Sequence, residues 1–185
     1  MLVIFVGKIG SGKTAAANIL KKYLFEEETF AEPIKQFLLS IGFRYEEVYG
    51  SQEEKLKINT FWNVSGREFM QKFATDLMRK QLQTIIPQLD LGGSTIWVRA
   101  MEKKIQDNPD KNIVIGDGRF PDEINLIKKY GGLVIKIIRP NSNHKFDSTH
   151  ESESYFDSIV PDYEIVNDGT FEDLENKIKS ILNLS

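Results

Sequence analysis

A glycine-rich segment near the N-terminus constrains the fold of this chain more than any other feature. Residues Gly7 to Thr14 read GKIGSGKT and match the pattern G-x-x-x-x-G-K-[ST]. The apolar run Leu2 to Val6 precedes it, as is typical of a strand buried on both faces of a parallel sheet. Thr14 to Leu24 then carries apolar residues at helical spacing. A strand, a loop and a helix in this order predict an α/β fold that binds a nucleotide.

The loop also predicts how the nucleotide is held. Its glycines let successive backbone N–H groups converge on a phosphate at the positive end of a helix. Lys13 is expected to reach the β- and γ-phosphates, and the Thr14 hydroxyl is expected to ligate Mg²⁺. The alternative is a glycine-rich turn with an incidental Gly-Lys-Thr, which the flanking strand and helix disfavour.

Strands and helices alternate through the rest of the chain. Strands are expected at residues 2–6, 28–31, 112–115, 133–138 and 163–166, and helices at residues 14–24, 33–41, 66–82, 96–105, 121–130 and 171–182. The charge-dense residues 44–59 are expected to form an exposed excursion. This alternation predicts a parallel sheet covered by helices on both faces.

Composition narrows the partners. The net charge of −3 gives no global positive field for polymeric nucleic acid, which leaves small phosphorylated ligands. The chain has no cysteine, which excludes disulfides and thiolate metal sites. Leu2 to Val6 is too short an apolar run for a signal peptide or a membrane span. A cytoplasmic enzyme of one domain, without a membrane partner, is therefore expected.

The phosphate loop does not fix the reaction, because GTPases, motor ATPases and small-molecule kinases share it. A GTPase is expected to carry an Asn-Lys-x-Asp guanine reader, and the sequence contains none. Asp117 ends a predicted strand, where its carboxylate could hold Mg²⁺ through water or orient an acceptor. Arg119 would face the same crevice and bind a phosphate. Alternatively, Asp117 caps the next helix and pairs with Arg119 at the surface.

Four further side chains are candidates for an acceptor site. Lys35 lies early in a helix that follows a strand, where it could meet a monophosphate, although a helical lysine is usually solvated. Arg67 and Gln71 are four residues apart, so one helix face could present both to a phosphate and a base edge, or form a surface pair. Trp97 could stack on a base or belong to the core.

Two later segments could complete the site. The polar residues 139–154 are long for a connection and are expected to form a lid. Arg139 ends a strand and could supply a cation to the transition state. Asp168 follows the last predicted strand, in a segment that is either a helix-starting turn or the rim on which adenine lies.

Taken in order, these motifs resemble those of the deoxynucleoside monophosphate kinases of bacteriophages and large DNA viruses, a branch of the P-loop nucleoside monophosphate kinase group. The resemblance spans nearly the whole chain. It rests on the Gly7 to Thr14 loop, Pro33-Ile34-Lys35, the Arg67 to Asp76 block, Ile96-Trp97-Val98, Asp117-Gly118-Arg119 with Glu123, Arg139-Pro140, and Asn167-Asp168-Gly169.

The resemblance implies a three-layer P-loop kinase fold with a five-stranded parallel sheet and helices on both faces. It implies that the γ-phosphoryl group of ATP passes to a deoxynucleoside 5′-monophosphate with Mg²⁺ as cofactor, giving a deoxynucleoside diphosphate and ADP. If the protein is viral, the expected compartment is the host cytoplasm. The resemblance leaves open whether the chain forms a homodimer. The alternatives are another small-molecule P-loop kinase, acting on a ribonucleotide or a coenzyme precursor, and a non-catalytic nucleotide-dependent binding module.

The resemblance also implies roles for individual residues. The monophosphate site would contain Lys35, Arg67, Gln71, Thr75, Trp97, Asp117, Arg119 and Glu123. The ATP site would contain Gly10, Gly12, Lys13, Thr14 and Ala15. The residue patterns described above add Ser11 and Asp168 to it. They also predict that catalysis uses Lys13, Asp117, Arg119 and Arg139, with Thr14 and, through water, Asp117 on the metal. One kinase domain, residues 1–185, would comprise a core (1–41, 108–138 and 160–185), a monophosphate-binding helical region (42–107) and a lid-like segment (139–154).

Overall fold

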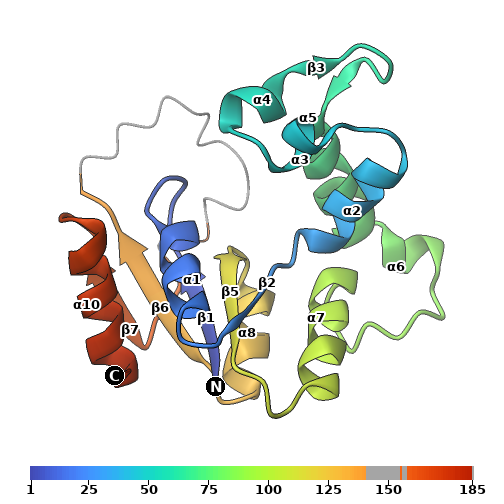
Figure 1. The fold of residues 1–185 in the computed structure, drawn as a ribbon. Helices are drawn as coiled ribbons and strands as arrows, with labels where there is room; N and C mark the ends of the chain where they lie inside the picture. The colour runs from blue at the N-terminus through green and yellow to red at the C-terminus, as the bar shows by residue number, and fades with distance from the viewer. Residues whose placement is uncertain (141–154, 156–157, 185) are drawn as a thin grey trace. The chain divides into compact units, whose positions relative to one another are not determined.

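The computed structural model describes residues 1–140, 155 and 158–184, which divide into two compact units (Figure 1). Unit 1 comprises Met1–Phe30 and Glu102–Ser185, and unit 2 comprises Ala31–Met101. The predicted core included residues 31–41, which the structure groups with unit 2, whereas residues 102–107 of the predicted helical region belong to unit 1. The lid-like segment lies outside the described residues, except for Arg139 and Pro140.

Unit 1 is built on a five-stranded sheet in which all neighbouring strands are parallel, as predicted. In spatial order the strands are β2 (Glu26–Glu28), β5 (Ile113–Gly118), β1 (Leu2–Val6), β6 (Leu133–Ile138) and β7 (Tyr163–Val166). β1 is central and is buried on both faces from Val3 to Val6, which explains its continuous apolar sequence.

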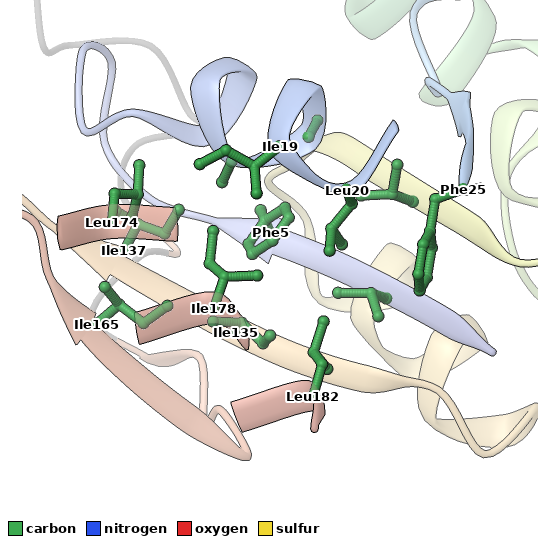
Figure 2. Close-up of a cluster of buried hydrophobic side chains, with 14 residues drawn as sticks. Phe5, Ile19, Leu20, Phe25, Ile135, Ile137, Ile165, Leu174, Ile178 and Leu182 are labelled. Carbon is green, nitrogen blue, oxygen red and sulfur yellow. The ribbon is translucent and has the colours of Figure 1, made fainter. Parts of the chain in front are cut away.

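Helices cover both faces of this sheet. α1 (Lys13–Lys21) and α10 (Phe171–Leu182) lie on one face, and α8 (Pro121–Lys129) packs against β1 and β6 on the other (Figure 1). Figure 2 shows the core between the sheet and the helices α1 and α10. Phe5, Ile19 and Ile178 are fully buried there. Each such side chain contributes about 1.5–3 kcal/mol relative to exposure, so this cluster fixes α1, and the loop before it, on the sheet.

The edge strand β2 lies earlier than the predicted residues 28–31, because backbone pairing with β5, and not an apolar pattern, sets its bounds. Its three residues are glutamates that pair with lysines from three other segments. The ion pairs are Glu26–Lys111 at 2.8 Å, Glu27–Lys21 at 2.9 Å and Glu28–Lys104. Charged side chains are usual on an edge strand, where they discourage pairing with another chain.

Unit 2 is mainly helical and includes the segment predicted as an exposed excursion. Its elements are α2 (Glu32–Ser40), α3 (Tyr45–Tyr49), α4 (Gln52–Leu56), the hairpin β3 (Ile58–Asn59) and β4 (Val64–Ser65), α5 (Gly66–Gln71), the π-helix η1 (Lys72–Arg79) and α6 (Leu82–Ile85). α7 (Ile96–Asp107) begins in unit 2 and ends in unit 1. Val48 and Glu47, within the predicted excursion, are buried. Exposure was the wrong expectation for these two residues, because Val48 packs with Ile34 and Leu38 of α2, and Glu47 accepts hydrogen bonds from Arg44 and Asn59.

A stack of phenylalanines joins α2 to the helical run of α5 and η1. The ring of Phe37 on α2 lies 5.2 Å from that of Phe73 and 6.3 Å from that of Phe69, measured between centroids. The single helix predicted for residues 66–82 instead changes from α to π at Lys72. None of the helices in the described part of the chain combines the length and apolarity that crossing a membrane requires.

Candidate functional site

The phosphate loop runs from β1 to α1 and presents several backbone donors. Gly10 and Gly12 adopt positive φ angles of 76° and 109°, which glycine accommodates without strain. Among the residues that the structure describes, the N–H groups of Gly10, Gly12, Thr14 and Ala15 have no hydrogen-bond acceptor. Four such amides at the N-terminus of a helix form a binding site for an anion.

The side chain of Lys13 lies over the same loop. Its ammonium group donates hydrogen bonds to the carbonyl oxygens of Gly7 at 2.5 Å and Lys8 at 3.0 Å. The Ser11 side chain is buried, and within the described residues its hydroxyl has no hydrogen-bond partner. A Cβ atom on Gly7 would lie 2.3 Å from that hydroxyl oxygen, so a larger residue at position 7 would distort the loop. The loop therefore combines a cation with close-packed backbone donors.

Asp117 is placed by an irregularity in β5. The register between β1 and β5 shifts between Ile4 and Val6, which marks a β-bulge at the end of β5. Bulges commonly redirect a side chain next to an active site. One carboxylate oxygen of Asp117 accepts a hydrogen bond from the backbone N–H of Phe30 at 3.1 Å. The carboxylate is therefore oriented by the backbone at the end of the segment that follows β2.

The end of β5 also lies against the start of α1. A Cβ atom on Gly116 would be 3.2 Å from the Cβ of Ala17 and 3.9 Å from the carbonyl oxygen of Lys13. A side chain at position 116 would therefore press on α1. The close approach brings the backbone next to Asp117 to the first turn of the helix that begins at the phosphate loop.

Glu123 organises the turn that carries Arg119. Its carboxylate is buried and accepts hydrogen bonds from the backbone N–H groups of Arg119 at 2.8 Å and Phe120 at 3.1 Å. It thereby satisfies the backbone at the start of α8, the capping role that the alternative interpretation gave to Asp117. Arg119 is half-buried. The contacts of Glu123 suit a residue that positions the Arg119 backbone, and its predicted contact with the monophosphate stays a prediction.

Two other predicted residues of unit 1 are exposed. Arg139 directly follows β6. Asp168 follows β7, and its carboxylate pairs with the ammonium group of Lys177 at 3.0 Å. That hydrogen bond is the largest cause of the lowered pKa of Asp168. The pairing is typical of a solvated surface, and the predicted contact of Asp168 with ATP stays a prediction.

The acceptor residues predicted in unit 2 lie on helices that pack together. Lys35 is on α2, Arg67 and Gln71 are on α5, and Thr75 is on η1. The phenylalanine stack joins these helices. Arg67 donates a hydrogen bond to the side-chain oxygen of Gln52 at 2.9 Å, which fixes its guanidinium group against α4. Thr75 is buried and Gln71 is half-buried.

A network of polar side chains surrounds Lys35. Its ammonium group lies 5.0 Å from the ring centroid of Tyr49, in a cation–π arrangement. The Tyr49 hydroxyl donates to Glu32 at 2.7 Å and accepts from Gln36 at 3.0 Å. Burial first, and then the hydrogen bond to Glu32, raises the pKa of Tyr49 to about 12. Tyr49 therefore stays neutral at physiological pH and presents its ring face to Lys35.

Trp97 is fixed by its indole nitrogen. The indole N–H donates to the carbonyl oxygen of Ala74, within η1, at 2.9 Å. The side chain is half-buried and packs, like Phe69 and Phe73, against the buried cluster of Ile34, Leu38, Phe43 and Val48. The indole N–H is thus satisfied by the protein backbone, which agrees with the interpretation of Trp97 as a core residue. Stacking on a base would use the ring face alone.

The oxygen ligands that the protein offers suit an Mg²⁺ ion bound jointly with substrate phosphates better than one enclosed by protein side chains alone. Within residues 1–140, 155 and 158–184, no three His, Cys, Asp or Glu side chains are grouped to hold a metal. Mg²⁺ is usually bound by one or two protein oxygens together with substrate phosphates. Thr14, exposed in the first turn of α1, and Asp117 at the end of β5 supply a hydroxyl and a carboxylate of that kind.

Sequence analysis missed two contacts that bear on the site. Tyr49 lies beneath Lys35, and Asn167 donates a side-chain hydrogen bond to the carbonyl oxygen of Ser11 at 2.8 Å. The position of Asn167 directly after a strand was a usable signal, because ligands collect at the carboxyl ends of parallel strands. No sequence signal pointed to Tyr49, since its contact depends on how α2 and α3 pack.

Comparisons with known proteins agree on a kinase. A family model described as "Deoxynucleotide monophosphate kinase" matches residues 42–178. A protein of Acanthamoeba polyphaga mimivirus, named "Putative deoxynucleotide monophosphate kinase", is 37% identical over 195 residues that cover 99% of this chain and 96% of the relative.

Solved structures support the fold alone. A dephospho-CoA kinase from Campylobacter jejuni has a TM-score of 0.52 at 16% identity, covering 98% of this chain and 95% of that one. A shikimate kinase from Aquifex aeolicus has a TM-score of 0.50 at 14% identity, covering 99% of this chain and 96% of that one. Their names agree with the P-loop kinase fold predicted from the sequence.

Proposed function

This chain belongs to the deoxynucleotide monophosphate kinase family, and from that premise we propose that it transfers the γ-phosphoryl group of ATP to a deoxynucleoside 5′-monophosphate. The products are a deoxynucleoside diphosphate and ADP. Membership makes the chain a nucleotide kinase with ATP as the phosphoryl donor. The deoxynucleotide acceptor, the dependence on Mg²⁺ and the roles of single residues are the proposed part.

One observation carries the donor half of this proposal: the backbone N–H groups of Gly10, Gly12, Thr14 and Ala15 have no acceptor among the described residues. Phosphoryl transfer depends on positioning and on neutralising negative charge, which such donors supply without reorganising. In the proposed mechanism they hold the β-phosphate, and Lys13 bonds to the β- and γ-phosphates in place of the Gly7 and Lys8 carbonyls.

Mg²⁺ would be held by the Thr14 hydroxyl and, through water, by Asp117, and it would neutralise charge on the β- and γ-phosphate oxygens. Asp117 is suited to this position because its hydrogen bond with Phe30 limits the orientations of its carboxylate. The acceptor phosphate is already a nucleophile, so the proposed mechanism gives Asp117 an orienting role and needs no strong general base. Arg119 and Arg139 would stabilise the negative charge on the phosphoryl group in the transition state of its transfer.

Lys35 and Arg67 are the proposed cations for the acceptor's phosphate. Each is fixed by a neighbour, Lys35 by the Tyr49 ring at 5.0 Å and Arg67 by Gln52 at 2.9 Å. Cations held in this way lose less conformational entropy when they bind a phosphate than free side chains do. Gln71 and Thr75, on the same helical run as Arg67, are proposed to contact the nucleoside.

The test is an ADP-release assay with ATP and Mg²⁺, in which each deoxynucleoside and ribonucleoside monophosphate is supplied separately. We expect release to depend on a deoxynucleoside monophosphate, with one deoxynucleoside diphosphate formed per ADP. Shikimate and dephospho-CoA serve as control acceptors. Release that is equal with and without acceptors would point to a nucleotide-dependent binding module. Release with ribonucleotides or a control acceptor alone would contradict the proposed substrate.

A further inference from the structure

Asn167 joins three segments of unit 1. It directly follows β7, and its backbone N–H donates to the carbonyl oxygen of Ile138, at the end of β6, at 2.7 Å. Its side-chain amide donates to the carbonyl oxygen of Ser11, in the phosphate loop, at 2.8 Å. Since a carbonyl can only accept, the side chain must present its NH₂ group to Ser11. One residue thus fixes the phosphate loop relative to the end of the sheet.

The space around this contact is closely filled. A Cβ atom on Gly12 would lie 2.5 Å from the side-chain nitrogen of Asn167 and 3.9 Å from a methyl carbon of Leu174. Leu174, on α10, belongs to the buried core in Figure 2. The Asn167 amide therefore occupies the volume that a side chain at position 12 would need, and the core limits its movement.

The contact sets the direction of a backbone donor. The peptide bond between Ser11 and Gly12 is trans, so its C=O and N–H groups point in opposite directions. When Asn167 holds the Ser11 carbonyl, the Gly12 N–H must point away from Asn167. That N–H is one of the four loop amides without an acceptor in the described part of the chain. Rotation of this peptide would replace a donor with a carbonyl oxygen in the anion site.

We propose that Asn167 is a positioning residue for the donor nucleotide: by holding the Ser11 carbonyl, it keeps the Gly12 N–H directed at the phosphates of ATP. The inference rests on the proposed function only for the identity of the donor. The Gly12 amide bonds to the nucleotide before and during transfer. Loss of its orientation therefore raises the KM for ATP more than it lowers kcat.

The informative variant is Asn167→Leu, which keeps the approximate shape of the side chain but removes its donor. A matched control is Thr170→Ala in the same turn, because the Thr170 hydroxyl accepts from the backbone N–H of Asp173 and caps α10 without touching the loop. Losing that cap lowers the stability of the protein. The control therefore reports what destabilisation of this turn does on its own.

We expect Asn167→Leu to raise the KM for ATP and the dissociation constant for ADP by about tenfold. The KM for the acceptor should change less than twofold. Thr170→Ala should leave all three constants unchanged, although its melting temperature falls. Asn167→Leu with wild-type constants for ATP and ADP would overturn the proposal, and so would equal increases for ATP and the acceptor.

Asn167→Asp gives a second measurement if the leucine variant does not fold. It keeps the shape and polarity of the side chain but presents an acceptor to the Ser11 carbonyl, so a larger loss of ADP affinity is expected. Unchanged affinity would again overturn the inference. Calorimetric binding of ADP needs no acceptor, so these experiments give an answer even if the enzyme proves to phosphorylate another substrate.

Discussion

The carboxylate of Asp117 and the backbone N–H of Phe30 form a hydrogen bond of 3.1 Å between residues that are 87 positions apart. Phe30 is the last residue of the first segment of unit 1, and Asp117 lies in the bulge at the end of β5. The bond ties the chain just before unit 2 to the sheet end from which the proposed site is built. Two properties of Asp117 can therefore be tested separately by substitution: its capacity to accept this hydrogen bond and its negative charge.

Replacing Asp117 with asparagine removes the charge but keeps an oxygen that can accept from Phe30. We therefore expect Asp117→Asn to melt close to the wild-type temperature and to lose at least about tenfold in kcat. Asp117→Ala removes the hydrogen bond as well and should cost about 1 kcal/mol of stability. Steady-state ADP release and thermal denaturation measure the two effects. Full activity of the asparagine variant would exclude the proposed role in metal binding or orientation.

Replacing Lys13 with alanine should lower kcat by about 10² to 10³ while the fold is retained, because a cation next to the transferred phosphoryl group is lost. The control is Lys21→Ala on the same helix, which removes an exposed ion pair with Glu27 at 2.9 Å. Such pairs contribute about 0–1 kcal/mol, so this variant should keep wild-type turnover. Circular dichroism checks both folds. An active Lys13→Ala enzyme would remove the phosphate loop from the mechanism.

Glu47 should make the stability of the protein sensitive to acid. Burial alone would raise its pKa, but hydrogen bonds from Arg44 and Asn59 hold the pKa below the ordinary value of 4.5. A carboxyl group with a lowered folded-state pKa stabilises the protein above its unfolded-state pKa, and this contribution is lost as the pH falls through the folded-state value. Denaturation below pH 4.5 should show the loss.

Glu47→Gln should lower the free energy of unfolding at neutral pH by about 1–3 kcal/mol, because the buried Asn59 amide and the part-buried Arg44 N–H lose their charged acceptor. The difference from wild type should shrink as the pH falls below 4.5. Glu46→Gln, at an exposed position on the same helix, is the control and should change little. A wild-type difference that stays constant down to strongly acidic pH would contradict the lowered pKa.

Tyr49 should contribute stability that is lost in alkali. Its folded-state pKa is about 12, above the unfolded value of about 10, so the folded state binds the phenolic proton more tightly. The contribution is complete below pH ~10 and disappears as the pH rises through 12. Tyr49→Phe should remove this part of the alkaline loss and one phenolate from the absorbance titration. If the titration step that is missing in Tyr49→Phe lies near pH 10, the raised pKa does not belong to Tyr49.

The same residue tests the support of Lys35. Tyr49→Phe keeps a ring beneath the ammonium group, so the KM for the acceptor should change less than twofold. Tyr49→Leu removes the ring, and the KM for the acceptor should rise about threefold, the effect of a cation–π contact of ordinary strength. The KM for ATP is the internal control and should stay constant in both variants.

The sheet was predictable where burial leaves a continuous apolar sequence. β1 and β6 are strands of this kind and lie at their predicted residues. β7, in which only Ile165 is buried, and the closing helix α10 also lie where they were predicted. β2 was misplaced because its three glutamates carry no apolar pattern and its backbone pairs with β5, which lies far away in sequence. The π-helix η1 escaped detection since its apolar residues satisfy an ordinary helical period as well.

The phosphate loop was predictable because its strand, glycines and helix are contiguous. The contacts that orient the loop and the bulge are not, since Asn167 and Ser11 are 156 positions apart, and Phe30 and Asp117 are 87 apart. The roles of Lys35, Arg67, Gln71, Thr75 and Trp97 came from a resemblance. Their placement on packed helices is compatible with those roles, which stay predictions.

The central position of β1 has a consequence for how the protein matures during translation. β1 pairs with β5 and β6. Even the partner strand that is nearer in sequence, β5, is remote, since Leu2 pairs with Ile113, 111 positions further along the chain. Unit 2 is one continuous segment, so all of it leaves the ribosome before β5 does. The phosphate loop therefore lacks both of the strands that flank β1 until β5 and β6 have been synthesised. Asn167 follows β7, so the ability to bind ATP should arise only after β7 has been synthesised.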